Sequence, residues 1–377
     1  MIRLGVVGCG RVTESRHLPA LRRVPSIEVV ALADVDEERL HNVAGAFGVA
    51  QRYTDYRALV EDKRVDAVAV CVPPALHSEI ALATISARKH VFIEKPLALT
   101  LGECDLLSDA ASRADSLTVM VGFNMRWHRL VREARERVRR GDLGKVKLAR
   151  TLFVSGVRNR SGYPGWRRRR ESGGGAILEL GVHHFDLLRF VLGSDAREVY
   201  ATSAAEDEAA VVSMIMSRDE HTVTSLCEGT GENHELEIYG ERGWLRVSCY
   251  RADGFEQVAA GQYPGSIRGR VGKLKRTLLD LPRILRQARM GGDYVATYRE
   301  EWRHFAHAVS NGRSPEATIE DGRHALEIAL AAWVSTETKR AVSIVSEDLV
   351  ATTEPASLPD AVSFVPTFPP EKQTHTV

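Results

Sequence analysis

The sequence predicts an α/β protein: an N-terminal doubly wound parallel sheet, then an α+β domain with a large, mostly antiparallel open sheet. Two observations predict this fold class. In residues 1–123, short apolar runs alternate with helical segments, as in parallel strands joined by crossover helices. After residue 124, strand-like segments follow one another with short connections that contain Gly, Asn or Asp, as in antiparallel sheets.

The composition is that of a globular chain of 377 residues, with 44% hydrophobic residues, 27% charged residues and a net charge of +1. This length can supply two domains with full cores. The near-neutral charge gives no general attraction to nucleic acid, and no apolar run reaches the ~18 residues that span a bilayer. The five cysteines show no C-x-x-C spacing, as in reduced proteins. We therefore expect a cytoplasmic protein with neither a nucleic-acid partner nor an integral membrane segment.

A glycine-rich turn follows the first predicted strand, residues 2–8. Gly8-Cys9-Gly10, with Thr13 in the third position, is a variant of the dinucleotide fingerprint G-x-G-x-x-G/A. Gly8 permits a tight turn, and Gly10 lets a pyrophosphate approach the N-terminus of the next helix. Arg11 and Val12 open that helix. The motif predicts a cofactor site only in the right strand and helix context.

The next predicted strand, residues 27–33, provides that context because it ends at Asp34. An acid about 20 residues after the glycines binds the adenosine ribose of dinucleotides. The alternative role for Asp34 is the N-cap of the helix that opens at residues 36–38. The order of strand, glycine turn, helix, strand and acid favours cofactor binding.

Two further predicted strands end in prolines. Residues 65–72 lead into Pro73-Pro74, and the apolar run 90–95 ends in Glu94-Lys95-Pro96. A lysine at the carboxyl end of a buried parallel strand lies where ligands bind in open α/β sheets, although an ordinary surface lysine is the alternative. Either isomer of the Lys95–Pro96 bond fits the sequence. A helix over 100–114 and a strand over 117–123 complete the first domain.

A predicted helix over residues 176–192 carries two adjacent histidines with different surroundings. His184 falls in a stripe of leucines and Val191, so we expect it to be a buried, hydrogen-bonded structural residue. Glu179, His183 and Asp186 are spaced i, i+4, i+7, which predicts a shared neighbouring face. A carboxylate that orients an imidazole makes a general base. The alternatives are a solvated, salt-bridged face and a metal site, for which further ligands are lacking.

Together, these motifs resemble the Gfo/Idh/MocA oxidoreductases, the glucose–fructose oxidoreductase and inositol dehydrogenase superfamily. The matching residues are Gly8-Cys9-Gly10, Asp34, Cys71-Val72-Pro73-Pro74 with His77, Glu94-Lys95-Pro96, Gly122-Phe123-Asn124 with Arg126, and Gly173-Gly174-Gly175 leading to Glu179, His183 and Asp186. The resemblance implies a Rossmann domain. It also implies hydride transfer that interconverts a secondary alcohol and a ketone on a sugar-, cyclitol- or nucleotide-sugar-like substrate.

The resemblance implies roles for particular residues. Lys95 and His183 form the catalytic pair, beside an acid at position 179 that is usually Asp in the family and is Glu179 here. The implied cofactor contacts are Gly8, Gly10, Arg11, Val12, Asp34, Pro73, His77, Glu94 and Lys95. The candidate substrate contacts are Arg126, Tyr163, Trp166 and Asp186. No metal is implied.

Asp34 favours NAD(H), because its carboxylate repels a 2′-phosphate; NADP(H) is the alternative. The resemblance also implies a homodimer or homotetramer. An NAD-dependent glycosidase of the same family and a non-catalytic dinucleotide-binding regulator are the alternative functions.

A basic segment interrupts the second domain. Eight Lys or Arg and one acid lie between residues 265 and 290, together with four leucines at helical spacing. Such a segment can touch a membrane or a phosphorylated partner, but we favour a solvated helix that packs on its own domain or on a sister subunit. The predicted boundaries are 1–123 for the cofactor domain, 124–350 for the substrate-binding and oligomerisation domain, and 351–377 for an extended or disordered tail.

Overall fold

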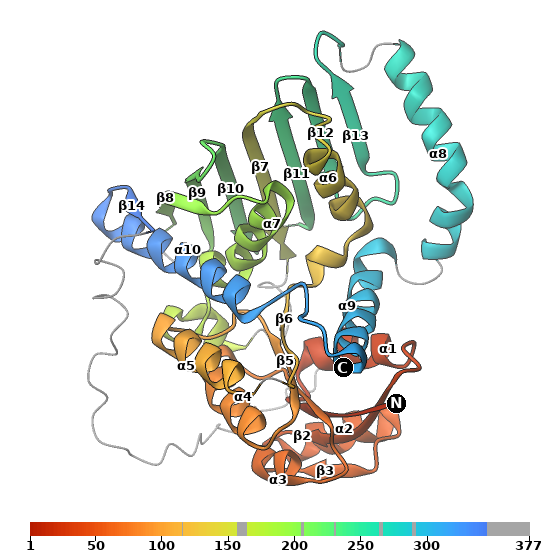
Figure 1. The fold of residues 1–377 in the computed structure, drawn as a ribbon, viewed down its shortest axis with the longest axis vertical. Coiled ribbons are helices and arrows are strands. Elements are labelled where there is room, and N and C mark those ends of the chain that lie inside the picture. Colours follow the sequence, from red (N-terminus) through yellow and green to blue (C-terminus); the bar gives the residue numbers. More distant parts are fainter. Residues whose placement is uncertain are drawn as a thin grey trace, which may run out of the picture.

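The computed structural model describes residues 1–114, 116–156, 164–204, 207–229, 231–263, 267–288 and 292–344. It confirms the predicted fold class: one parallel sheet, followed by one large, mostly antiparallel sheet with helices (Figure 1). The predicted tail at 351–377 and the candidate substrate contact Tyr163 lie outside the described residues.

The first sheet has six strands in the order β3-β2-β1-β4-β5-β6, and every neighbouring pair is parallel. The strands are β1 (Ile2–Val7), β2 (Ile27–Ala33), β3 (Gln51–Tyr53), β4 (Ala67–Val70), β5 (His90–Glu94) and β6 (Val119–Gly122). The order in which the strands are added to the sheet reverses between β1 and β4, which places a crevice at the carboxyl ends of these two strands. The edge strand β3 was not among the predicted strands, because three residues with two polar side chains make no apolar run.

Short helices connect these strands. A π-helix, η1 (Thr13–His17), and α1 (Leu18–Leu21) follow β1, and α2 (Glu37–Phe47) and α3 (Tyr56–Glu61) flank β3. The connection after β4 contains η2 (Pro74–Leu76) and α4 (His77–Ser86), and α5 (Leu101–Ser112) lies between β5 and β6.

The second sheet has eight strands in the order β13-β12-β11-β7-β10-β9-β8-β14. They are β7 (Val146–Ser155), β8 (Ala196–Ser203), β9 (Ala209–Met216), β10 (His221–Glu228), β11 (Asn233–Gly240), β12 (Gly243–Ser248), β13 (Phe255–Ala259) and β14 (Val342–Ser343). Only the β7–β10 pair among them is parallel. The two outermost strands, β13 and β14, were not predicted.

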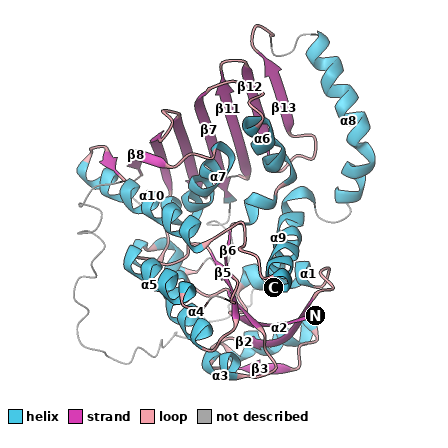
Figure 2. Cartoon of the chain, viewed as in Figure 1, coloured by secondary structure: helices cyan, strands magenta, loops and turns pink. Residues whose placement is uncertain are grey.

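Among the described residues, helices cover one face of this sheet and leave the other open. The covering helices are α6 (Arg129–Arg139), α7 (Val182–Leu192) and α10 (Ile319–Thr338) (Figure 2). Burial alternates along β8, β9 and β10, as expected for a sheet with one packed face. The strands still expose large apolar side chains, since Leu148, Tyr200 and Val211 are 39–44% exposed.

The last helices return to the first sheet. On α9 (Gly292–Asn311), the fully buried Trp302 and Phe305 pack against Phe92 of β5, with ring centroids 4.3 and 6.1 Å away. The Val121 N–H of β6 donates to the Ala317 carbonyl at 3.1 Å, and α10 packs on α5. The core of the first sheet is therefore completed by residues far beyond position 123.

The basic segment forms one long helix, α8 (Ile267–Ala288). It lies at the outer edge of the molecule beside β13 and makes contact with α9 (Figure 1). In the part of the chain that the structure describes, no helix combines the length and the apolar character needed to cross a membrane.

Candidate active site

The glycine turn has the geometry of a phosphate-binding loop. Gly8 has φ +96°, and a Cβ on it would stand 2.3 Å from the Cys71 carbonyl oxygen, so only glycine fits. The space around Gly10 is open to 4 Å from where its Cβ would lie, which leaves room for a ligand. Thr13 replaces the third glycine, and its hydroxyl donates to the Gly8 carbonyl at 2.7 Å. The threonine thus ties the helix to the turn. Beside the turn, Arg11 is exposed and Val12 is half-buried.

Asp34 lies at the carboxyl end of β2, beside this turn. Its Oδ2 accepts from the Cys9 N–H at 2.7 Å, and its Oδ1 accepts from the Asp36 N–H at 2.9 Å. The N-cap of α2 is Asp36, not Asp34, so the alternative role considered for Asp34 does not apply. Sequence reasoning missed Arg39, whose guanidinium lies 3.5 Å from Asp34 Oδ1 and is 48% exposed.

Glu94, at the end of β5, is held by a relay of hydrogen bonds. Trp302 Nε1 donates to His17 Nδ1 at 3.1 Å, which leaves the proton of His17 on Nε2, 2.8 Å from Glu94 Oε1. Burial alone would raise the pKa of Glu94, but the hydrogen bond from His17 and nearby positive charge outweigh it and lower that pKa. Glu94 is therefore a carboxylate, and His17 joins it to α9.

His77 connects two loops at the same edge of the sheet. Its Nδ1 lies 2.7 Å from the Pro96 carbonyl oxygen and its Nε2 lies 2.9 Å from that of Val72, and the ring is buried. Pro73, next to Val72, is the half-buried N-cap of η2. The Lys95–Pro96 bond is cis. The contacts of His77 brace the loops, which differs from the direct cofactor contact predicted for it.

Lys95 reaches across to the second domain. Its Nζ donates to the Glu179 backbone carbonyl at 2.8 Å and lies 3.5 Å from Glu179 Oε1. Arg167 Nη2 donates to the same Oε1 at 2.6 Å. Burial would raise the pKa of Glu179, but the charges of Arg167 and Lys95 lower it below its ordinary value. Glu179 is thus an anion between two cations, and the predicted contact with His183 is not among its hydrogen bonds in the described residues.

Arg167 was not predicted as a site residue. It lies on η5 (Gly165–Arg168), with its guanidinium carbon 5.4 Å from the centre of the half-buried Trp166 ring. The triple glycine explains its position. A Cβ on Gly174 would stand 2.1 Å from the Arg167 carbonyl oxygen, and the Gly175 N–H donates to that oxygen at 3.0 Å. The glycines therefore let the Arg167 turn pack directly against the start of the next helix.

That helix starts as a π-helix, η7 (Ile177–Gly181), and continues as α7. A π-helix bonds i to i+5, so it rotates the residues before it relative to an α-helical register. This shift changes the register predicted for Glu179 relative to His183 and Asp186, which both lie in α7. Glu179 turns to Lys95, whereas Asp186 turns into the core. Such π segments recur at functional sites.

His183 is near enough to Lys95 for the ammonium charge to affect its pKa. The ring keeps accessible surface, but its Nδ1 is buried and has no hydrogen-bond partner among the described residues. Burial and then the charge of Lys95 lower the pKa of His183 well below its ordinary value. His183 is therefore a neutral imidazole at neutral pH, the form that can accept a proton. Lys95, Glu179 and Arg167 are thus in direct contact, the charges of Lys95 and Arg167 act on His183, and the pairing of Lys95 with His183 stays a prediction.

Arg126 and Asp186 do not face this site, although both were predicted to contact substrate. Arg126 Nε donates to Asp186 Oδ2 at 2.8 Å, and the two residues are 4% and 2% exposed. Asp321 Oδ1 lies 2.9 Å from the same guanidinium. The charges of Arg126 and Asp186 thus neutralise each other in the core, which makes them structural.

His184 is buried, as predicted, but its hydrogen bonding differs from the prediction. Among the described residues, neither ring nitrogen of His184 or of His234 has a partner. The two rings stack at 4.6 Å, and both stack on Phe153. Burial lowers the pKa of His184 to about 3. Both histidines are therefore uncharged packing residues behind His183.

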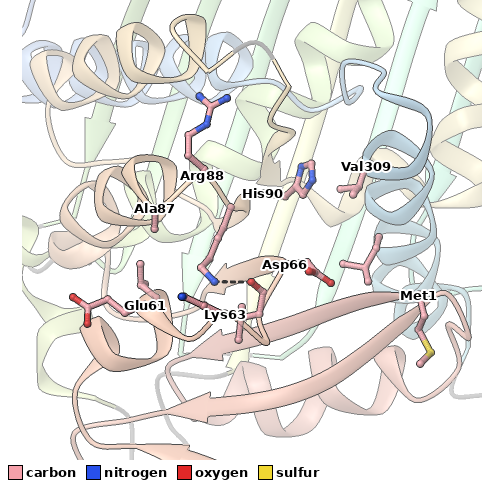
Figure 3. Close-up of a pocket in the computed structure, with 12 residues that line it drawn as sticks. Met1, Glu61, Lys63, Asp66, Ala87, Arg88, His90 and Val309 are labelled. Atoms are coloured by element: carbon pink, nitrogen blue, oxygen red, sulfur yellow. Dashed lines mark hydrogen bonds between the residues drawn. The ribbon is translucent and has the colours of Figure 1, made fainter.

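A cavity of about 620 Å³ lies away from these groups, at the amino ends of the first-sheet strands. Met1, Lys63, Asp66, Arg88 and His90 are among its lining residues (Figure 3). Lys89, which also lines it, donates to the Asp62 and Val65 carbonyls at 2.7 and 2.5 Å. None of the predicted site residues lines this cavity, so we do not assign the reaction to it.

Comparison with known proteins agrees with the geometry. Residues 2–123 match the GFO_IDH_MocA model, an oxidoreductase family with an NAD-binding Rossmann fold, and residues 135–344 match the C-terminal alpha/beta domain of that family. The chain is 29% identical to myo-inositol 2-dehydrogenase of Thermotoga maritima, over 91% of this chain and 98% of that one. It is 28% identical to D-apiose dehydrogenase of Paraburkholderia graminis, over 90% and 89%.

Solved structures show the same fold. A probable dehydrogenase from Thermotoga maritima is 27% identical, with a TM-score of 0.73 over 91% of this chain and 99% of that one. A scyllo-inositol dehydrogenase from Lactobacillus casei, solved with NAD(H) and scyllo-inositol, is 20% identical, with a TM-score of 0.74 over 92% and 100%. At that identity, the second likeness concerns the fold alone.

The buried ion pair of Arg126 generates a stability prediction. Arg126→Leu leaves Asp186 in the core without its guanidinium, which should cost about 3–5 kcal/mol of unfolding free energy. Arg137→Leu, the control, removes an arginine that is 39% exposed and bonded to Asp142, and should cost at most about 1 kcal/mol. Urea unfolding measures both. An Arg126→Leu protein of normal stability with only a raised KM would restore the substrate-contact role.

The histidine stack generates a prediction about pH. Below pH 6.5 the unfolded chain protonates His184, whereas the folded chain does not until about pH 3. The unfolding free energy should therefore fall with decreasing pH across this window, by about 1.4 kcal/mol per pH unit for each such histidine. His184→Phe keeps a ring in the stack but removes the titrating group. It should reduce the slope of the unfolding free energy against pH by the contribution of about one proton. The exposed His221→Gln is the control, and an unchanged slope in His184→Phe would contradict the assignment.

Proposed function

Because the chain belongs to the Gfo/Idh/MocA oxidoreductase family, we propose that it interconverts a secondary alcohol and a ketone on a sugar- or cyclitol-like substrate, using NAD(H). One observation carries the proposal: Lys95 of the first domain lies 2.8 Å from the Glu179 carbonyl of the second, and its charge lowers the pKa of His183. Two relatives, a myo-inositol 2-dehydrogenase and a D-apiose dehydrogenase, supply the substrate class.

The residues at the glycine turn fit a dinucleotide. Gly8 shapes the turn, Gly10 leaves the space above it open, and Asp34 retains acceptor capacity beyond its two backbone hydrogen bonds. These groups would hold the pyrophosphate and the adenosine ribose. When bound, nicotinamide supplies the acceptor or donor of the hydride.

The chemical work of the protein is proton transfer and stabilisation of charge on oxygen. An alcohol carbon can give up hydride only as its hydroxyl loses a proton. His183, held neutral by burial and by the nearby cations, takes that proton as a general base. Lys95 donates a hydrogen bond to the same oxygen and stabilises the negative charge that develops there. In the reverse direction, the two residues donate to the ketone oxygen.

Glu179 and Arg167 have a positioning role in this proposal. Glu179 holds the Lys95 ammonium through its backbone carbonyl and its carboxylate, and Arg167 fixes that carboxylate. This role replaces the predicted orientation of His183 by Glu179. Trp166, half-buried beside the Arg167 guanidinium, offers an apolar ring surface of the kind that packs on sugar rings.

The open face of the second sheet fits the expected homodimer or homotetramer. Leu148, Tyr200 and Val211 are 39–44% exposed on its strands, and apolar surface of this kind marks protein interfaces when it is contiguous. We propose that second copies of the chain cover this face.

The cofactor preference follows from Asp34. Two like unit charges ~4 Å apart repel by about 1 kcal/mol in water and about 4 kcal/mol near a protein surface. A 2′-phosphate carries more than one charge, so kcat/KM should favour NAD(H) by at least about tenfold. Arg39 reduces the preference by offering the phosphate a cation. Asp34→Asn keeps an acceptor for the Cys9 N–H but removes the charge. It should therefore lower the ratio of kcat/KM with NAD(H) to kcat/KM with NADP(H). The control, Asp55→Asn at the N-cap of α3, should leave this ratio unchanged. Equal efficiency of the unmodified enzyme with both cofactors would contradict the assignment.

The catalytic pair predicts the strongest losses. A positioned acid or base contributes ~10²–10⁴-fold, so His183→Ala should lower kcat by that factor, about 3–5 kcal/mol of barrier. Lys95→Ala should cost as much or more, and the double variant should lose far less than the product. Glu179→Gln should cost less than Lys95→Ala, since the backbone carbonyl that receives the 2.8 Å hydrogen bond remains.

Turnover is first measured on a panel of polyols, aldoses and nucleotide sugars, by following NADH absorbance in both directions. Fluorescence titration with NADH should show unchanged binding by His183→Ala, because the glycine turn and Asp34 are intact. Near-normal turnover by either alanine variant would rule out the shared site. Cleavage of an aryl glycoside without net NADH would instead identify the glycosidase branch of the family.

A further inference from the structure

Helix α8 rests on its own domain through only one side. Thr277, Asp280 and Ile284 line a small space shared with Leu130 of α6 and Phe255 of β13. The four leucines at helical spacing do not pack on this domain. The apolar side chains that face away from the domain are Val271, Leu274, Leu278, Leu279, Leu281 and Leu285, which are 42–73% exposed.

These exposed side chains form a continuous ridge. Positions 271, 274, 278, 281 and 285 alternate in steps of three and four, which keeps them on one side of an α-helix for about four turns. The helix lies at the outer edge of the molecule (Figure 1), so the ridge is convex and accessible along its length. A convex ridge fits a flat, deformable surface without requiring a matching groove.

The charge beside the ridge has one sign. The segment 265–290 contains eight Lys or Arg and one acid, Asp280, and that acid is on the side facing the domain. Lys275, Arg283 and Arg286 are exposed. Surface-lying amphipathic helices combine an apolar face with Lys and Arg on the polar face and low overall hydrophobicity. Tyr263, 82% exposed just before the helix, is of a residue type enriched at membrane–water boundaries.

We propose that α8 docks the enzyme on an anionic lipid surface. The leucine ridge enters the boundary between headgroups and acyl chains, and Lys275, Arg283 and Arg286 meet the anionic headgroups. Neither the apolar ridge nor the basic residues suffice alone. One helix face gives marginal membrane binding, and each basic residue near an anionic leaflet raises the binding constant about fivefold. The attachment is peripheral and reversible.

A second copy of the chain is the less suitable occupant. The three-four spacing also occurs in coiled coils, but paired α8 helices would set seven cations against seven, and like charges across an interface are costly. The open face of the large sheet, with its own exposed apolar residues, offers a second copy a surface without this repulsion.

The test is co-sedimentation of the full chain with vesicles. Phosphatidylcholine vesicles containing phosphatidylglycerol should pellet the protein, pure phosphatidylcholine vesicles should not, and added salt should release it. Leu274→Ser with Leu278→Ser, and separately Lys275→Glu with Arg286→Glu, should weaken binding by on the order of tenfold or more. The matched controls are Leu106→Ser, on α5 and 57% exposed, and Arg23→Glu with Arg113→Glu, both exposed.

Three results would overturn the proposal. The first is absence of binding to anionic vesicles by the intact chain. The second is an equal loss of binding in the controls. The third is a change of sedimentation coefficient in the Leu274→Ser, Leu278→Ser protein without vesicles, which would identify a second copy as the occupant. Turnover in solution should be unchanged in all the α8 variants, because none of these residues lies in the catalytic machinery.

Discussion

The arrangement of the two domains depends on the hydrogen bond and the ion pair that the Lys95 ammonium makes with Glu179. Its side chain is 10% exposed, and a charge held away from water is costly unless it is hydrogen-bonded and paired. Both partners, the carbonyl and the carboxylate of Glu179, belong to the second domain. The preceding residue, Glu94, is bonded by His17, which in turn accepts from Trp302 of α9. Two adjacent residues at the end of one strand therefore hold both domains in register.

The Lys95 ammonium also contributes to the different protonation states of Glu179 and His183. Lys95 and Arg167 keep Glu179 ionised, while burial and Lys95 keep His183 neutral. Glu179 can thus remain an anion that stabilises Lys95, while His183, four residues later, remains neutral and able to accept a proton. A second set of charges, Arg126 with Asp186 and Asp321, pairs within the second domain.

The sequence predicted what depends on local patterns. Apolar runs, glycines and proline boundaries were sufficient for the parallel sheet and for the turn at Gly8, and the position of Lys95 followed from parallel strands ending at one edge. The partner of Glu179 could not be predicted, because the π-helical turn rotates it away from the register that an α-helix would give. Nothing in the local sequence separates Arg167 from the three arginines that follow it, and the pairing of Arg126 with Asp186 joins residues 60 positions apart. Edge strands such as β3 are too short to leave a periodic signal.

The return of α9 and α10 to the first sheet has a consequence for how the chain matures on the ribosome. Trp302 and Phe305 are fully buried against Phe92, so the first sheet exposes that apolar surface until about four-fifths of the sequence has been synthesised. N-terminal domains generally fold first during translation, but this one lacks part of its core until α9 emerges. The nascent chain should therefore carry an exposed apolar surface through most of its synthesis, a natural target for chaperones, and the two halves should mature as one cooperative unit.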